Sequence, residues 1–358
     1  MGRLAHCALA ARLRPQCLDD VVGQDCAVRA LRSSINAGYS HSAYCLMGPR
    51  GTGKTSLSRI LSKCLNCSHG ITDAPCHACT SCRDVDEGRR VDYVEVDAAS
   101  NRGVDQMCAL LSSSSYAPLS SRHRIYAIDE AHMLTPQALT SMLKTLEEPP
   151  VHVKFILCTT DAAKIPSTVR SRALGLCLPP LSTEDLCRLL RRVLREHCVP
   201  FRSSALSIMA AAAHGSAREA IAAAEWAAAD ALGGVLSPCM ACCASDAMAR
   251  AMLEAIAYGN APAVQAACYA ASALNASPSM LLDRMMRTIN DTAMHQCIPG
   301  LTPHHGAGLR ATARMARAMG ARRAQAMYRT LLFGKRELRL SCGEHTGLSM
   351  VALRAMAV

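Results

Sequence analysis

The sequence lacks any long hydrophobic run, any internal repeat and any low-complexity tail. No window of membrane-spanning length is free of charge, because charged residues interrupt even the alanine-rich stretch 205–232. Residues 1–10 contain no acid, but their apolar run is too short for a secretory signal. His6 also stands where an N-myristoylation signal needs Ser or Thr. We therefore expect a soluble cytoplasmic protein with no membrane partner.

The composition is unusual in its 20 cysteines and its net charge of +11. Without a secretory signal, most of these cysteines are expected to be free thiols that pack as small buried residues. The positive charge favours a polyanionic partner, although charge alone does not name one. A length of 358 residues allows two or three domains.

A phosphate-binding pattern stands near the N-terminus, in Gly-Pro-Arg-Gly-Thr-Gly-Lys-Thr at 48–55. A strand-like run, 43–47, precedes it, and helical spacing of apolar residues follows over 56–65. Loop N–H groups at a helix N-terminus suit a phosphate chain. Lys54 is expected to reach the β- and γ-phosphates, and the Thr55 hydroxyl to reach Mg²⁺. The predicted nucleotide-binding residues here are Gly48, Pro49, Arg50, Gly51, Thr52, Gly53, Lys54, Thr55 and Ser56.

Further strand-like runs lie at 93–96, 125–128 and 155–159, with helical patterns between them. This alternation predicts a mostly parallel sheet covered on both faces, with its ligands at the carboxyl ends of the strands. Asp129 and Glu130 end one of these strands. We expect Asp129 to orient the Mg²⁺ shell and Glu130 to polarise an attacking water. Thr160, at the end of the next strand, could sense the γ-phosphate, although threonine is common in strands.

Four cysteines, Cys67, Cys76, Cys79 and Cys82, have the spacing C-x8-C-x2-C-x2-C. This spacing predicts a closed Cys₄ zinc site, which leaves no open position for catalysis. His69 and His77 are alternative ligands, and Cys64 lies close enough to be confused with Cys67. A second C-x-x-C, at 239–242, has no partner pair and is interpreted as packing.

Two arginines each have two possible roles. Arg172 could form an ordinary surface salt bridge, or it could be an arginine finger offered to the nucleotide of a neighbouring subunit. Arg218, near the start of a predicted helix, could fold back on the phosphates or lie on a solvated face.

The pattern changes after Pro179-Pro180, where strand-like runs give way to successive helices. Gly233-Gly234 and Ser237-Pro238 mark a further break. We therefore predict an α/β nucleotide-binding domain over 1–178, with the cysteine module at 64–84, followed by two all-α domains over 179–238 and 239–358.

With these motifs in order, the chain resembles the bacterial DNA polymerase III gamma/tau family, the ATPase subunits of the sliding-clamp loader within the AAA+ superfamily. The resemblance rests on Asp20-Val-Val-Gly-Gln24, Asp129-Glu-Ala-His-Met-Leu134 and Leu143-Lys-Thr-Leu-Glu-Glu-Pro-Pro150, with the cysteines directly after the phosphate-loop helix. It implies an AAA+ domain with a zinc-binding insertion, a small helical lid and a helical collar. It also implies ATP, Mg²⁺ and Zn²⁺ as cofactors. The implied partners are delta and delta-prime type subunits, other copies of the chain, the sliding clamp and primed DNA.

The resemblance also implies a role for each matching residue. Lys54 and Thr55 match the Walker A motif, and Asp129 and Glu130 match Walker B. The remaining correspondences are Thr160 with sensor 1, Arg218 with sensor 2, Arg172 with the trans-acting finger and Val22 with the adenine contact. Lys54, Glu130 and Arg172 are therefore the expected catalytic residues.

The sequence departs from the family in two places. Ala173 replaces the cysteine of the family's Ser-Arg-Cys, and the chain ends at Val358, as expected of a short gamma form. Two alternative functions stay open. One is another AAA+ DNA-remodelling ATPase, such as a branch-migration motor, and the other is a stator-like clamp-loader subunit that does not hydrolyse ATP. A zinc-dependent nucleic-acid module is disfavoured, because the cysteine segment lacks basic and aromatic neighbours.

Overall fold

The computed structural model describes residues 14–87, 92–100, 103–114, 116–197, 199–230, 240–274, 276–298 and 309–358. The chain divides into two compact units, the first within 1–193 and 215–222 and the second within 194–214 and 223–358. The boundary therefore passes through helices α8 (Thr183–Glu196) and α10 (Ala217–Asp230). The N-terminal segment 1–10 and the predicted break at 233–238 lie outside the described residues.

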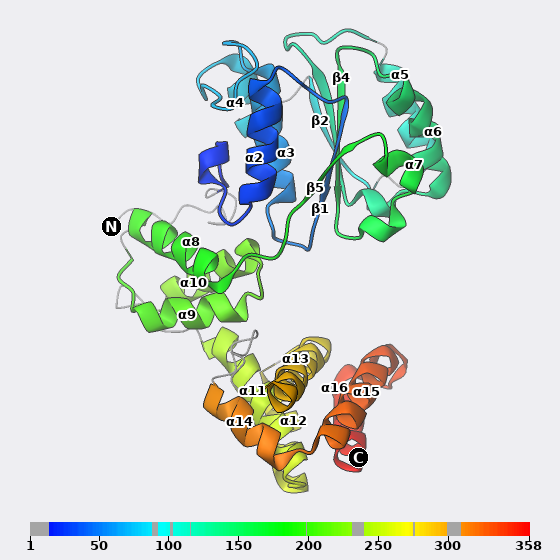
Figure 1. Ribbon diagram of the computed structural model, residues 1–358. Coiled ribbons are helices and arrows are strands. Elements are labelled where there is room, and N and C mark those ends of the chain that lie inside the picture. Colours follow the sequence, from blue (N-terminus) through cyan, green and yellow to red (C-terminus); the bar gives the residue numbers. More distant parts are fainter. Residues whose placement is uncertain are drawn as a thin grey trace. The chain divides into compact units, whose positions relative to one another are not determined.

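The first unit is built on a parallel five-stranded sheet, in the order β2-β3-β4-β1-β5 (Figure 1). The strands are β1 (Ala43–Met47), β2 (Tyr93–Asp97), β3 (Arg124–Asp129), β4 (Val153–Thr159) and β5 (Leu174–Cys177). The predicted parallel sheet is confirmed, and β5 is a strand that the sequence did not predict. β5 is short, contains Gly175 and has only Leu176 fully buried, so it carries little of the apolar pattern of a strand.

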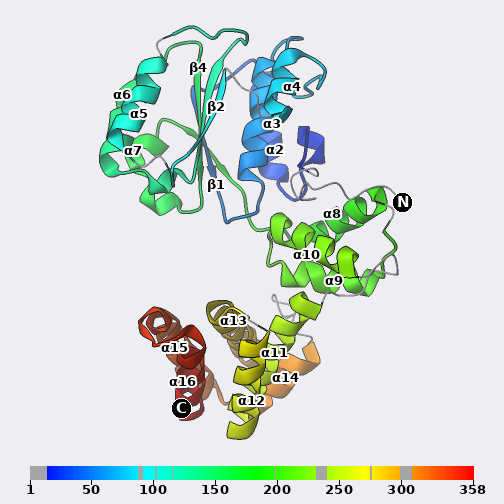
Figure 2. The same cartoon turned by 180° about the vertical axis from the view of Figure 1, so that it is seen from behind.

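Helices cover both faces of this sheet, as Figures 1 and 2 show from opposite sides. One face carries α2 (Asp25–Asn36) and α3 (Lys54–Asn66), with α4 (Thr80–Glu87) beside α3. The other carries α5 (Val104–Ser113), α6 (Pro136–Glu147) and α7 (Ser167–Arg170). Successive strand residues serve opposite cores, because side chains alternate across a sheet. Thus Tyr44 and Leu46 pack with the α3 side, and Ala43 and Cys45 with the α6 side.

Short 3₁₀ turns connect these elements at η1 (Leu18–Asp20), η2 (Ala131–Met133) and η3 (Ala162–Lys164). Two of them lie directly after strand ends: η2 begins two residues after β3, and η3 begins three residues after β4. The chain therefore turns sharply where the polar strand ends Asp129-Glu130 and Thr159-Thr160 are found.

The described residues of the second unit form helices joined by turns and short loops, with an isolated bridge residue at Phe201, in agreement with the predicted change from α/β to all-α. Its helices are α9 (Ser203–Ala212), α11 (Met240–Ala257), α12 (Ala261–Ala273), α13 (Pro278–Cys297), α14 (Leu309–Ala318), α15 (Ala321–Glu337), η4 (Leu338–Leu340) and α16 (Glu344–Met356). α15 and α16 approach closely at Gly334, where a Cβ atom would lie 2.4 Å from a methyl group of Val351. None of the described helices is long and apolar enough to cross a bilayer.

The C-terminal end of α3 is joined to the start of β3 by one buried side chain. Asn66 accepts a hydrogen bond from the backbone N–H of His123 and donates one to the carbonyl oxygen of the same residue, both at 2.8 Å. Asn66 is 5% exposed. The side-chain amide of Asn66 therefore provides hydrogen-bond partners for both backbone groups of His123. Asn66 directly precedes Cys67, the first cysteine of the C-x8-C-x2-C-x2-C segment.

Replacing Asn66 with Ala is expected to lower the free energy of unfolding by about 2–4 kcal/mol, because two backbone groups lose their partner in a buried position. Urea denaturation would measure the change. Asn36→Ala is a matched control, since Asn36 ends α2 as Asn66 ends α3 but is exposed. The control should change stability by no more than about 0.5 kcal/mol. Equal effects of the two substitutions would contradict the role given to Asn66.

Candidate nucleotide site and cysteine cluster

The phosphate loop lies between β1 and α3, and the next two strands on one side of β1, which are β4 and β3, end in the polar residues singled out above. β1 pairs with β4, and β4 pairs with β3, so the ends of these three strands lie at one edge of the sheet. This is where open parallel sheets bind ligands. Helix α3 begins at Lys54, two residues before the predicted helical run, because Gly53 caps it in the left-handed region at φ 99°.

The loop is packed too closely to accept side chains at two of its glycines. A Cβ atom at Gly48 would lie 2.2 Å from the carbonyl oxygen of Leu178, and one at Gly51 would lie 2.0 Å from Oγ of Ser216. The backbone N–H of Ala217, the first residue of α10, also donates to the carbonyl oxygen of Gly51 at 3.0 Å. The start of α10 therefore holds the phosphate loop from the outside.

The Lys54 side chain folds over this loop. It is 6% exposed, and its Nζ donates to the carbonyl oxygens of Gly48 and Pro49, each at 2.8 Å. Burial lowers the pKa of Lys54, the negative charge of Glu130 opposes that shift, and the positive charge of Arg218 adds to it. The ammonium group of Lys54 therefore lies at the phosphate loop, where a bound phosphate would also lie.

Thr55 and Asp129 meet at a distance suited to a hard cation. Oγ1 of Thr55 donates to Oδ2 of Asp129 at 2.9 Å, while Oδ1 of Asp129 accepts from the backbone N–H of Glu130 at 2.9 Å. Magnesium takes oxygen ligands at about 2.1 Å in an octahedron, in which neighbouring ligands are about 3 Å apart. The hydroxyl and the carboxylate therefore fit a magnesium site.

Glu130 has a strained backbone and several polar contacts. Its φ is 49°, in the left-handed region that side chains other than those of Gly, Asn and Asp rarely occupy. Its Oε2 accepts from Oγ1 of Thr160 at 3.0 Å and lies 3.5 Å from Nδ1 of His132, and its Oε1 lies 3.5 Å from Nε of Arg50. The carboxylate thus connects the end of β3 to the end of β4 and to the phosphate loop.

The other predicted residues lie in different surroundings. Val22 is half-buried in the loop before α2, and Arg218 is exposed as the second residue of α10. Among the described residues, Arg172 has no hydrogen bond or ion pair with the phosphate loop; it binds Glu147 instead. The structure therefore brings Lys54 to the loop carbonyls and Thr55 to Asp129. It also brings Thr160 to Glu130, and it leaves Arg172 apart.

Two residues at this site carried no predicted role. Gln24, only 2% exposed, donates through Nε2 to the carbonyl oxygens of Thr52 at 3.4 Å and Pro179 at 2.9 Å. His132 contacts Glu130 and also lies 3.2 Å, through Nδ1, from Oγ1 of Thr159. Both belong to motifs used for the family resemblance, which was the available signal. Neither the residue type nor the spacing of Gln24 and His132 predicts these hydrogen bonds.

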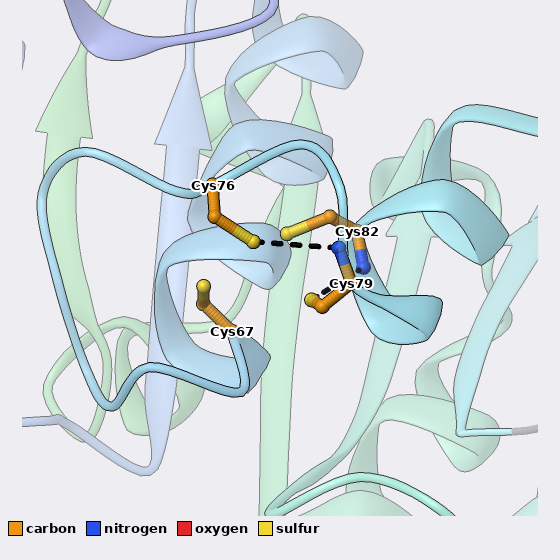
Figure 3. A group of neighbouring side chains, drawn as sticks. All are labelled: Cys67, Cys76, Cys79 and Cys82. Atoms are coloured by element: carbon orange, nitrogen blue, oxygen red, sulfur yellow. Dashed lines mark hydrogen bonds between the residues drawn. The ribbon is translucent and has the colours of Figure 1, made fainter.

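The four cysteines converge at one place, with their sulfur atoms turned toward one another (Figure 3). Cys67 follows α3, Cys76 and Cys79 precede α4, and Cys82 lies in its first turn. All four Sγ atoms lie within 4.8 Å of one another. Four thiolates at about 2.3 Å from a tetrahedral zinc would be about 3.8 Å apart, so this donor set fits zinc after a small contraction.

Backbone N–H groups already point at two of these sulfurs. Cys79 N–H donates to Sγ of Cys76, and Cys82 N–H donates to Sγ of Cys79, each at 3.4 Å. The N–H groups of Ala78 and Cys79 lower the pKa of Cys76 to about 5, which favours the metal-binding thiolate. The chain is therefore folded around the sulfurs in the way that a metal site requires.

The alternative ligands are placed less favourably. Cys64 lies in the hydrophobic core against the sheet, where burial raises the pKa of its thiol to about 12. His69 approaches only Cys67, with Nδ1 at 3.9 Å from Sγ, and Nδ1 of His77 lies 3.5 Å from Nζ of Lys63. This geometry favours the four-cysteine set over a set containing either histidine.

The parallel sheet, the phosphate loop and the acidic end of β3 define the class of the fold as that of the AAA+ nucleotide-binding proteins. The RuvB Holliday junction branch migration motor of Thermotoga maritima has this fold, with a TM-score of 0.50 and 18% sequence identity. The match covers 68% of this chain and 79% of the motor. A point mutant of RuvB gives a TM-score of 0.51 at 19% identity, with the same coverage. At such identities, the likeness is one of fold alone.

Known proteins of similar sequence give a narrower comparison. A family model described as DNA polymerase III, delta subunit, matches residues 23–182. Subunit tau of DNA polymerase III from Escherichia coli K12 is 38% identical over 358 residues, which is 99% of this chain and 56% of that protein. Subunit gamma from Buchnera aphidicola of Schizaphis graminum is 43% identical over 213 residues, covering 60% of this chain and 59% of that protein. The chain is therefore similar over 99% of its length to a DNA polymerase III tau subunit, and it spans about half the length of these relatives.

Proposed function

We propose that this chain is the ATP-hydrolysing motor subunit of a bacterial DNA polymerase III clamp loader. In this role it would bind ATP, help to open the ring-shaped sliding clamp, and release the closed ring on primed DNA after hydrolysis. The observation that carries the proposal is the arrangement of three hydrogen bonds at the carboxyl edge of the sheet. Lys54 binds the carbonyl of Gly48 in the phosphate loop, Thr55 binds Asp129, and Thr160 binds Glu130. A further support is the sequence similarity to a DNA polymerase III tau subunit, which extends over nearly the whole chain.

The residues of the site divide the chemistry among them. The loop N–H groups and Lys54 would bind the phosphates of ATP. Thr55 and Asp129 would hold magnesium, which would supply positive charge beside the phosphates. Glu130 accepts a proton from the water that attacks the γ-phosphate, and Thr160 orients that carboxylate. Val22 packs near the adenine, and Arg218 reaches the phosphates from the start of α10.

Arg172 acts in this proposal on the ATP of a neighbouring copy. Its separation from its own phosphate loop, and its position on a half-exposed segment after α7, support a trans-acting role. The partners are then other copies of the chain, delta and delta-prime type subunits, the sliding clamp and primed DNA, which places the protein in the cytoplasm. The domain division at 178 and 238 also belongs to this proposal.

The cysteine cluster has a structural role in the same proposal. Four thiolates fill a tetrahedral shell, so bound zinc would stabilise the segment and take no part in hydrolysis. DNA contacts would come from arginine side chains and helix N-termini that bind phosphates without reading bases.

The two alternatives explain fewer of the observations. A stator-like subunit would have no need for Lys54 and Glu130 in the arrangement found here. A branch-migration motor has the same fold, but the fold alone carries no function, and the sequence similarity to tau and gamma subunits favours the clamp loader.

ATP hydrolysis by the purified chain tests the proposal, first alone and then with sliding clamp, delta-type partners and primed DNA. We expect weak turnover alone, a stimulation of roughly tenfold or more with clamp and DNA, and loss of turnover in Lys54→Ala. Turnover that is indifferent to clamp and DNA would contradict the clamp-loading role. No turnover in any mixture would favour the stator-like subunit.

A further inference from the structure

Arg172 is held by two anchors from different elements. Its Nη2 lies 2.6 Å from Oε1 of Glu147, the last residue of α6, and its Nη1 donates to the carbonyl oxygen of Thr168 in α7 at 2.8 Å. The side chains of Arg172 and Glu147 are 36% and 49% exposed. The guanidinium is therefore fixed at the surface of the first unit without being covered.

These anchors leave donors of the guanidinium free for another ligand. A guanidinium has five N–H donors in one plane, and the two anchors need only one from each terminal nitrogen. One N–H on each terminal nitrogen and the Nε–H can therefore donate to an incoming anion while both anchors stay in place.

The position of Glu147 is unfavourable for α6 itself. A negative charge at a helix C-terminus opposes the helix dipole, and here Glu148 follows directly as a second acid. An exposed ion pair adds at most about 1 kcal/mol to stability. The stability of α6 therefore does not explain why an acid stands at position 147. The orientation of the Arg172 guanidinium does explain it.

We propose that Glu147 is a positioning residue that holds Arg172 in the orientation needed to contact the γ-phosphate of ATP bound by a second copy of this chain. This inference rests on the proposed function, in which Arg172 acts in trans. The second copy supplies the anion, because its phosphate loop binds the same triphosphate, and the exposed guanidinium supplies the complementary charge. A guanidinium displaced by about 1 Å loses a large part of its effect on the transition state.

Mixed assemblies of two inactive chains isolate this effect. A Lys54→Ala chain cannot turn over ATP but has an intact Arg172, and an Arg172→Ala chain has an intact nucleotide site but no finger. Mixed together with clamp, partner subunits and primed DNA, they should recover turnover wherever the two copies are neighbours. The Glu147→Ala substitution is then added only to the Lys54→Ala chain, so that the hydrolysing site itself is unchanged.

We expect Glu147→Ala to reduce the recovered kcat by about tenfold, with the KM for ATP unchanged. Glu148→Ala on the same chain is the matched control, because Glu148 is exposed and its side chain has no ion pair within the described parts of the chain. The control should leave the recovered turnover unchanged. Glu147→Asp should restore part of it, since the carboxylate is kept on a shorter side chain.

The outcomes separate this inference from the function on which it rests. If the two inactive chains recover no turnover together, the trans-acting role of Arg172 fails, and the inference fails with it. If they recover turnover that Glu147→Ala does not reduce, Glu147 does not position Arg172, although the trans-acting role stands. Equal losses from Glu147→Ala and Glu148→Ala would show a general effect of charge at the end of α6, and would also overturn the inference.

Discussion

Glu130→Gln is expected to reduce ATP turnover by about 10²-fold or more while ATP binding is retained. Glutamine has almost the same shape as glutamate and can still accept the hydrogen bond from Thr160, but it cannot take a proton from water. Lys54 and Thr55 are unchanged, so a fluorescent ATP analogue should bind with nearly unchanged affinity. Single-turnover hydrolysis and equilibrium titration would measure the two effects separately.

The matched control is Asp97→Asn, the same chemical change at the end of the neighbouring strand β2. Oδ1 of Asp97 accepts from Ala99 N–H, and Oδ2 accepts from the Ser100 hydroxyl, both at 2.9 Å within its own turn. An asparagine can keep most of this turn, so turnover should stay within about twofold of the unchanged chain. If Glu130→Gln and Asp97→Asn lower turnover equally, Glu130 is not the general base.

Cys79→Ser is expected to remove bound zinc and to lower the midpoint of thermal unfolding by about 5 °C or more. Cys79 is the central cysteine of the two C-x-x-C turns, and its sulfur also accepts the N–H of Cys82. With one thiolate missing, the tetrahedral shell stays open and the affinity for zinc falls. Zinc content per chain and calorimetric unfolding would measure the two consequences.

Cys108→Ser is the control for the loss of a thiol, because Cys108 is exposed on α5 and lies outside the cluster. It should change neither zinc content nor unfolding temperature. A Cys79→Ser chain that keeps about one zinc per chain would contradict the four-cysteine assignment. A chain that loses zinc but unfolds at the same temperature would contradict the structural role of the metal.

The features that the sequence predicts best are those formed by residues close together along the chain. Strands β1, β3 and β4 each contain a continuous apolar run, and the phosphate loop is one contiguous motif whose flanking elements can be recognised. The cysteine cluster follows largely from spacing, because the two C-x-x-C turns bring the sulfurs of Cys76, Cys79 and Cys82 together by local geometry. Cys67 joins them from the end of α3. β5 was missed because Gly175 and exposed neighbours leave it with almost no apolar pattern.

The sequence does not predict the side-chain contacts between residues that are distant along the chain, because these contacts depend on the folded backbone and on side-chain rotamers. Glu130 and Thr160 were each singled out, but the hydrogen bond between them requires the left-handed backbone at Glu130 and the pairing of β3 with β4. Glu147 and Arg172 lie on different elements, and no local sequence pattern predicts the ion pair between them. Gln24 reaches Pro179 across 155 positions of sequence, a contact that only the folded chain defines. The roles of these residues in ATP turnover stay predictions.

The most direct test of the central claim is the transfer of a sliding clamp onto primed circular DNA. The chain, its partner subunits, labelled clamp and ATP are mixed with the DNA, and clamp that stays on the circle is measured after removal of free protein. We expect ATP-dependent loading that is lost with Lys54→Ala and with an ATP analogue that cannot be hydrolysed. Loading that is equal without ATP, or equal with the Lys54→Ala chain, would contradict the central claim.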